Sequence, residues 1–273
     1  MSTMNFALPI AGTRPGRPGI PWAISDAFAI ARRILIRIVR SPEELAASTS
    51  TPIIFVLLFR YVFGGAIHTG ATNYANYLMA GIFVQTVAIT SLAAGTGMAQ
   101  DLRAGLIDRF RSLPITRSAV ITGRVLATLV RDLFTLAIVV AVGLVVGFRP
   151  AGSPVDWAAA VGLLLVFGFA ISWIGVSVGL MVRNLEAVQN VTMSLVFPLT
   201  FLSSAFVPTQ TMPTALRIFA ANQPMTQVID AVRALALGNP AGVEAWVGLA
   251  WALVIVAVFA PLAVIAYGRA TGR

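Results

Sequence analysis

The sequence predicts an all-α integral membrane protein. Hydrophobic residues make up 58% of its 273 residues and charged residues only 11%, and the mean hydropathy is +0.88. A water-soluble fold of this length cannot bury so much apolar surface. Six apolar segments approach or exceed the ~20 residues that an α-helix needs to cross a bilayer. These predicted spans are residues 49–67, 75–98, 122–148, 157–182, 187–207 and 245–267.

Two segments of different composition precede the spans. Residues 1–21 contain four prolines and three glycines, which is typical of a disordered lead-in rather than of a signal peptide. Residues 22–41 place Asp26, Arg33 and Arg37 on one side of a helix and apolar side chains on another. This pattern predicts an amphipathic helix that lies at an anionic membrane surface and does not cross it.

We expect the remainder of the chain, residues 45–270, to form one six-span transmembrane domain. The connection after the fifth span is long, about 37 residues from Pro208 to Glu244, and four prolines divide it. Two helix-like pieces lie between these prolines, at 214–221 and 225–237. Each is too short to cross a bilayer, so both are expected to be re-entrant or to lie on the outer surface.

The arginines predict the orientation of the chain in the membrane. All nineteen basic residues are arginine and none is lysine. An N-terminus inside the cell puts fourteen arginines on the cytoplasmic side and leaves only Arg149, Arg217 and Arg233 outside, as the positive-inside rule requires. Six spans then return the C-terminus to the cytoplasm. The bias toward arginine fits a GC-rich genome, and we expect a bacterial cell membrane.

Composition also excludes several kinds of chemistry. The chain has no cysteine, so thiol catalysis and cysteine-ligated metals are excluded. A phosphate-binding P-loop needs a lysine, which this chain lacks, so a partner must hydrolyse any ATP that drives it. One histidine and ten scattered acidic residues give no catalytic cluster for a membrane-embedded enzyme. We expect no bound cofactor, no metal and no nucleic-acid partner.

The loop between the second and third spans, Gln100 to Arg117, carries charges of both signs between two apolar segments. Its apolar residues recur at helical spacing, which predicts a short amphipathic helix that ends at Pro114. One interpretation is an anchor whose apolar side rests on lipid. The other is a docking helix for a protein groove, and the aspartates favour it because an anionic membrane repels carboxylates.

Two segments resemble a known family. The stretch from Gln100 to Arg124, with Arg103, Gly105-Leu106, Asp108-Arg109-Phe110, Leu113-Pro114 and Thr116-Arg117, is similar to the loop after the second span of ABC-2 type transporter permeases. Residues 202–235, from LSSAFVPTQTMP to ANQPMTQVIDAVRAL, resemble the segment after the fifth span of the same family. The daunorubicin and drug-resistance exporter branch is the most similar. With the six-span layout, the resemblance covers about residues 22–270.

The resemblance implies partners and a coupling site. In this family the first cytoplasmic loop is a coupling helix that docks on a separate ATPase subunit, which binds ATP and Mg. A second permease copy or a paralogue completes the transporter, and membrane lipids surround it. The residues that would contact the ATPase are Asp101, Arg103, Leu106, Asp108, Arg109, Phe110, Arg111 and Leu113. The absence of lysine departs from relatives that mix lysine and arginine.

The sequence therefore predicts the permease subunit of an ATP-driven exporter of a hydrophobic or amphipathic small molecule or lipid. The chain would not be an enzyme by itself. Apolar side chains in the spans are candidates for the substrate path because charged groups at that depth are scarce. These candidates are Phe55, Phe59, Phe83, Met193, Phe197 and Phe201. The alternatives are an ion-coupled secondary transporter and a membrane anchor or sensor that does not transport.

For three charged residues near the spans, the sequence allows two interpretations of their position in the membrane. Arg60 either lies near the outer end of the first span and reaches water, or sits at mid-membrane and faces a partner or a wet path. Arg131 and Asp132 lie near the cytoplasmic end of the third span, where they either reach the interface or face a transport path. Asp132 is the one carboxylate that the sequence places inside a span.

Overall fold

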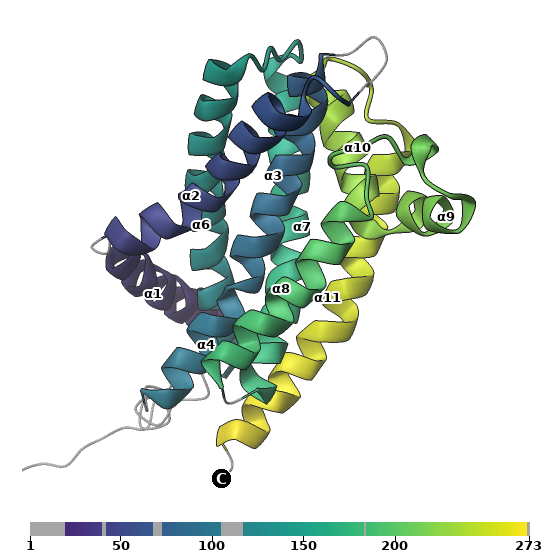
Figure 1. The fold of residues 1–273 in the computed structure, drawn as a ribbon. Coiled ribbons are helices and arrows are strands. Elements are labelled where there is room, and N and C mark those ends of the chain that lie inside the picture. The colour runs from purple at the N-terminus through teal and green to yellow at the C-terminus, as the bar shows by residue number, and fades with distance from the viewer. Residues whose placement is uncertain (1–19, 40–41, 68–72, 105–116, 183, 272–273) are drawn as a thin grey trace, which may run out of the picture.

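The computed structural model describes residues 20–39, 42–67, 73–104, 117–182 and 184–271 (Figure 1). Regular structure in these ranges is helical, with no strand, which confirms the all-α prediction for them. The elements are α1 (Ile20–Val39), α2 (Pro42–Leu57), the π-helical η1 (Leu58–Phe63), α3 (Tyr74–Leu92), α4 (Ala94–Arg103), α6 (Arg117–Val146), α7 (Pro154–Met181), α8 (Leu185–Phe201), the short 3₁₀ turn η2 (Thr209–Thr211), α9 (Thr214–Asn222), α10 (Pro224–Ala236) and α11 (Gly242–Thr271). Nearly all of the expected lead-in, residues 1–19, lies outside the described ranges.

Four helical stretches are long and apolar enough to cross a membrane. They are Tyr74–Arg103, Val120–Val146, Pro154–Met181 and Gly242–Arg269. The segment at the first predicted span, Ser48–Phe63, is apolar but shorter. At the fifth predicted span, α8 has 17 residues. Length and composition in the described chain thus support four of the six predicted spans.

Several helix ends differ from the expected ones. The second predicted span does not stop at residue 98, because α4 continues the line of α3 to Arg103 after a single turn residue. The fifth was expected to reach residue 207, but α8 ends at Phe201. There the amide of Gln223 donates hydrogen bonds to the carbonyls of Leu199 (2.8 Å) and Leu202 (2.5 Å), which satisfies the last carbonyls of the helix.

Helix starts follow from capping side chains. Ser153 and Asp156 form a capping box ahead of α7, with Pro154 in the first turn, where its missing N–H costs nothing. The side chains of Asn73 and Asn184 accept hydrogen bonds from the first turns of α3 and α8. Polar residues that precede apolar runs therefore fix where α3, α7 and α8 begin.

Helix α7 lies at the centre of the bundle and contacts α3, α4, α6, α10 and α11. Three glycines, Gly95, Gly175 and Gly179, bring α7 into backbone contact with α4 and with the last residue of α3. A β-carbon at Gly175 would lie 2.5 Å from the carbonyl oxygen of Leu92, and one at Gly179 would collide with the carbonyl of Gly95. Small residues at such crossings let membrane helices pack closely, where burial of apolar surface from water supplies no driving force.

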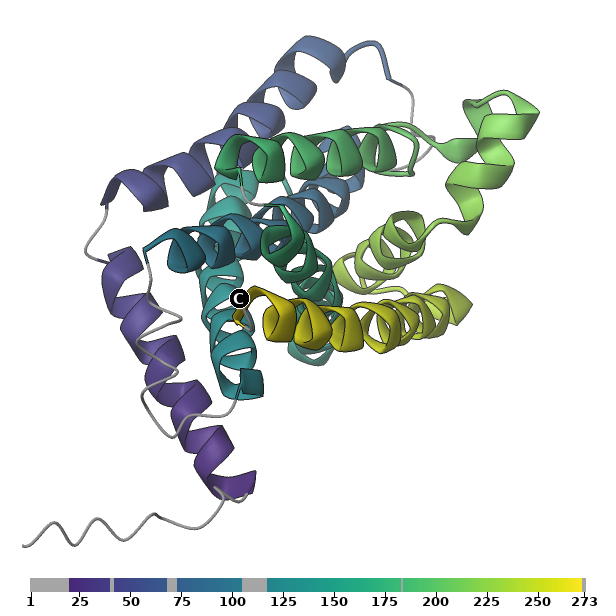
Figure 2. The same cartoon turned by 90° about the horizontal axis from the view of Figure 1, so that it is seen from below.

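The two ends of the bundle differ (Figures 1 and 2). The end of α4 and the C-terminal end of α11 both lie at the lower end in Figure 1. The connection from α6 to α7, which carries Arg149, lies at the opposite end with the link between α10 and α11. A second, smaller apolar core from α1, α4, α6, α7 and α11 fills the lower end.

Candidate functional site

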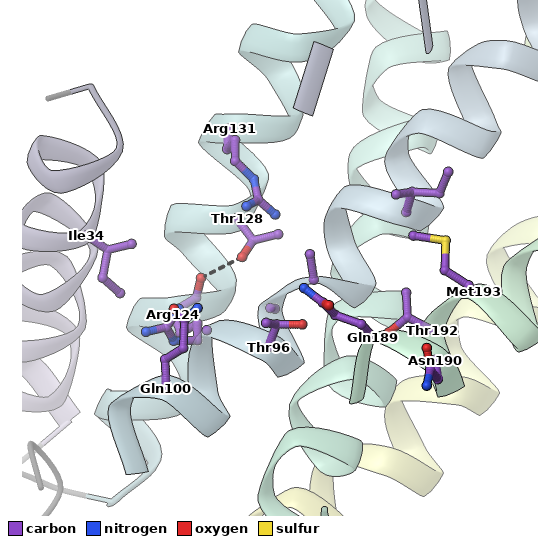
Figure 3. A pocket seen from close by; sticks show the side chains of 14 residues that line it. Ile34, Thr96, Gln100, Arg124, Thr128, Arg131, Gln189, Asn190, Thr192 and Met193 are labelled. Atoms are coloured by element: carbon purple, nitrogen blue, oxygen red, sulfur yellow. Dashed lines mark hydrogen bonds between the residues drawn. The ribbon is translucent and has the colours of Figure 1, made fainter. Parts of the chain in front are cut away.

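A cavity of about 610 Å³ lies between four helical segments, α1, the junction of α3 with α4, α6 and α8 (Figure 3). Its lining residues are Ile34, Ile89, Ala93, Ala94, Thr96, Gly97, Gln100, Arg124, Thr128, Arg131, Gln189, Asn190, Thr192 and Met193. Because these residues belong to the last turns of α3–α4, the first half of α6 and the first turns of α8, the cavity occupies the lower half of the bundle as drawn in Figure 1.

The wall of this cavity is unusually polar for a chain so rich in apolar residues. Carboxamide, hydroxyl and guanidinium groups from three helices point into it: α4 contributes Gln100, α6 contributes Arg131, and α8 contributes Gln189 (Figure 3). The guanidinium of Arg131 also donates a hydrogen bond to the carbonyl of Thr90. Such a surface can hydrogen-bond the polar part of a ligand, whereas a purely apolar ligand would make no use of these groups.

An ion pair joins the two helices that flank the loop between the second and third predicted spans. Arg124, in the second turn of α6, pairs with Asp101, near the end of α4. Their side chains are only 10% and 14% exposed. Gly97 makes room for the pair, because a β-carbon there would collide with the guanidinium of Arg124. The pair connects the helix ends on either side of the loop, here called the roots of the loop. Arg124 is also part of the cavity wall.

The predicted ATPase contacts divide into two groups. Asp101 and Arg103 lie in the last turn of α4, so they extend a membrane helix rather than belong to a separate loop helix. The carboxylate of Asp101 is held by Arg124, whereas Arg103 is exposed. The other six predicted contacts, Leu106, Asp108, Arg109, Phe110, Arg111 and Leu113, lie outside the described residues.

Four of the six predicted path residues come together. Phe55 of α2 and Phe59 of η1 meet Phe197 and Phe201 of α8, with ring centroids 6.1 Å apart for Phe55–Phe197 and 6.4 Å for Phe59–Phe201. The sequence analysis missed Phe206, whose ring stacks on Phe59 at 4.0 Å and completes this aromatic cluster.

The other two predicted path residues lie elsewhere. Phe83 is 1% exposed and packs against Phe148 and Trp157, with centroids 5.9 and 6.4 Å away, in the main apolar core. Met193 lines the polar cavity. It precedes Phe197 by one helical turn, so α8 carries Gln189, Met193, Phe197 and Phe201 at intervals of four residues. One side of α8 thus leads from the polar cavity to the aromatic cluster.

The structure gives hydrogen-bond partners for the charged residues near the predicted spans. Arg60 donates a hydrogen bond from Nε to the carbonyl of Val146 (3.3 Å), at the end of α6 opposite to the ion pair, which supports the interpretation that places it near the outer end of its helix. Asp132 is fully buried and accepts a hydrogen bond from Ser91 (2.7 Å). Its neighbour Arg131 lines the cavity, but Asp132 itself does not.

A polar network of side chains and carbonyls holds the segment after α8 in place. Arg233 of α10 donates hydrogen bonds to Asp230 (2.5 Å) and to the carbonyls of Ser204 (2.6 Å) and Tyr77 (3.2 Å). The hydroxyl of Ser204 donates to Asp230 (2.6 Å), and the guanidinium lies 3.8 Å from the ring centre of Tyr77. These bonds tie α10 and the turns after α8 to the start of α3. Among the described residues, no group of three or more His, Cys, Asp or Glu side chains could hold a metal ion.

Comparisons with known proteins show which family the chain resembles. The family model described as ABC-2 type transporter matches residues 26–237. The chain is 33% identical, over 92% of its length and 88% of the relative's, to the daunorubicin resistance ABC transporter permease protein DrrB1 of Streptomyces coeruleorubidus. It is 26% identical to "Probable doxorubicin resistance ABC transporter permease protein DrrC" of Mycobacterium tuberculosis, over 99% of both chains. The doxorubicin resistance ABC transporter permease protein DrrB of the same organism is 26% identical over 71% of this chain and 70% of its own.

Proposed function

The chain belongs to the ABC-2 type transporter family, and from this premise we propose that it is the transmembrane permease subunit of an ABC exporter driven by a separate ATPase. The observation that carries the proposal is the similarity to drug-resistance ABC permeases over nearly the whole chain. The substrate would be a hydrophobic or amphipathic small molecule or a lipid that leaves the cell. The polar cavity favours an amphipathic one, because its wall offers hydrogen-bonding side chains beside apolar ones.

The side of α8 that links the cavity to the aromatic cluster suggests the route of the substrate. Its polar group would enter between Gln100, Arg131 and Gln189, and its apolar part would lie along Met193 and Phe197. Aromatic rings at the far end offer a large apolar surface without charged groups. Phe83 would support this route from the core rather than line it.

Two further helices would complete the six spans. The run of α2 and η1 is continuous from Pro42 to Phe63, which at 1.5 Å per residue is about 33 Å, enough for the hydrocarbon core. The 17 residues of α8 stand at the lower limit of about 17 for a span. We place residues 45–270 in one transmembrane domain, with α1 at the inner surface and α9 and α10 near the outer surface. The N- and C-termini would be cytoplasmic, in a bacterial cell membrane.

The partners follow from the proposed function. An ATPase subunit, which would carry ATP and Mg, would dock on the loop between α4 and α6. A second copy of this chain or a paralogue would complete the permease. Movement of the ATPase would reach the cavity directly, because Gln100 and Arg124 at the roots of the loop both line it and the Asp101–Arg124 pair holds the roots together.

Co-purification tests the docking site. The wild-type chain, expressed with a candidate ATPase, should retain it through affinity purification, and the double variant Asp108→Ala plus Arg109→Ala should lose most of it. Arg217→Ala, an exposed arginine on α9, is the matched control and should assemble like the wild type. Equal assembly of the double variant, with transport-coupled ATP hydrolysis intact, would show that the loop does not dock the ATPase.

A further inference from the structure

A second, apolar groove lies between α1 and α6, apart from the polar cavity. Its volume is about 480 Å³, and its wall consists of Phe28, Ala31, Arg32, Leu35, Ile36, Leu126, Leu129 and Val130. Several of these side chains are open to the surroundings, with Phe28 63% and Val130 50% exposed. Of the described apolar window of α6, only 28% is buried inside the protein, so most of that window is exposed at the surface of this chain.

The groove is a fixed feature, because α1 packs firmly on α6 (Figure 1). Ala27, Ile30 and Ala31 are at most 8% exposed. The helices cross at Gly123, where a β-carbon would lie 2.7 Å from the carbonyl oxygen of Ala27 and 2.8 Å from the side chain of Ile30. Helix α1 therefore cannot close the groove by settling further onto α6.

One cation interrupts the apolar wall. Arg32 is exposed and lies one helical turn from Phe28 on one side and from Ile36 on the other. Among the described residues, no hydrogen bond or ion pair engages Arg32. A guanidinium in an apolar setting is stable when an anion or water reaches it, and its planar donors match the oxygens of a phosphate. The groove thus offers apolar surface for a hydrocarbon chain beside a donor for a phosphate.

We propose that this groove binds a phospholipid of the inner leaflet, with one acyl chain between α1 and α6 and the lipid phosphate at Arg32. Acidic lipids are preferred, because Arg32 is exposed at the groove and the chain carries a formal net charge of +9. A second copy of this chain is a poorer occupant, since none of the groove residues is a carboxylate that could meet Arg32. The assignment to the inner leaflet rests on the proposed function and its orientation.

Native mass spectrometry of the purified full-length chain tests the site. The chain in mild detergent would be mixed with phosphatidylglycerol or phosphatidylcholine of identical acyl chains, without ATP or ATPase. The wild type should bind phosphatidylglycerol about fivefold better than phosphatidylcholine, the effect of roughly one arginine near an anionic surface. Arg32→Gln should remove this preference, and Val130→Trp should reduce the binding of both lipids by filling the groove. Arg217→Gln, on α9, should bind like the wild type.

Several results would overturn the proposal. One is unchanged lipid binding in both groove variants, and another is a wild type that shows no preference for phosphatidylglycerol. A third is a dimer that Val130→Trp abolishes while lipid binding persists, because this result would assign the groove to a second copy. Because Arg32→Gln changes an exposed side chain, it stays informative if Val130→Trp fails to fold. Lipid binding here with no ATPase assembly would contradict the exporter assignment alone, so the two proposals fail separately.

Discussion

The Asp101–Arg124 pair shows what a single contact contributes at the residue scale. It is almost buried, it joins α4 to α6 across the loop, and one partner lines the cavity. Asp101 was expected to contact the ATPase, and Arg124 appeared only as the end of the stretch that resembles the family. Their opposite charges flank the loop in the sequence, which was a signal for pairing. A contact over 23 residues still depends on how α4 and α6 pack, and no local pattern specifies that packing.

Reversal of one charge in this pair should uncouple the transporter. Asp101→Arg or Arg124→Asp alone leaves two like charges in a largely buried site, and loss of a buried pair costs about 3–5 kcal/mol. We expect a lower midpoint of thermal unfolding and fewer substrate molecules moved per ATP hydrolysed. The double variant Asp101→Arg plus Arg124→Asp restores an opposite pair, so it should recover most of the unfolding temperature and most of the transport per ATP. A double exchange no better than either single change would mean that the pair does not act as a unit.

Arg233 should be irreplaceable by lysine. It donates to two carbonyls and one carboxylate with a planar fork, and its side chain is 13% exposed. Arg233→Lys keeps the charge but cannot satisfy the three acceptors together. We therefore expect the lysine variant to lose about 1–3 kcal/mol of unfolding free energy, which is most of the loss expected for Arg233→Ala. Thermal unfolding in detergent measures the difference. A lysine variant as stable as the wild type would refute the role of the fork.

At the scale of elements, the long apolar helices were predictable and helix contacts were not. Runs of apolar residues located the four helical stretches that are long enough to cross a membrane, and Ser153, Asn73 and Asn184 are recognisable capping residues. The end of α8 was not predictable, because it depends on Gln223, which lies 24 residues from Leu199 in the sequence. Packing also explains why the candidates for the substrate path divided among the aromatic cluster, the apolar core and the polar cavity.

The glycine contact between α4 and α7 should be sensitive to added volume. Gly175→Leu would push the side chain into the backbone at Leu92, so the variant should unfold at a clearly lower temperature or fail to express. Gly162→Leu on the same helix is the matched control, since a β-carbon there would meet nothing within 4 Å. Equal melting temperatures for the two variants would contradict a tight α4–α7 crossing.

Phenylalanines of the aromatic cluster and of the core should behave differently. Phe197→Ala removes a half-buried ring from the proposed route and should change transport of a fluorescent amphiphile with little loss of stability. Phe83→Ala empties a fully buried site and should cost about 3–5 kcal/mol. Leu195→Ala, on an exposed part of α8, should change neither. Transport unaffected by Phe197→Ala would remove Phe197 from the route.

The whole molecule is a helical bundle with a polar cavity in one half and an aromatic cluster that one side of α8 connects to it. The fold class and the family were accessible from composition and from two sequence motifs. The cavity was not, because its wall combines residues from four segments that are each unremarkable in sequence. If the proposed ATPase docks on the loop, the position of the cavity beside the roots of the loop would give a physical path from ATPase movement to the substrate.

Transport by the reconstituted complex tests the central claim most directly. The chain and its ATPase partner would be placed in proteoliposomes, and movement of a fluorescent amphiphile would be followed with ATP, with a non-hydrolysable analogue, and with ATP plus a protonophore. The account predicts movement that requires ATP hydrolysis and continues when the proton gradient is collapsed. Movement that stops on collapse of the gradient while ATP is present, or that proceeds without the ATPase, would contradict it and favour an ion-coupled carrier.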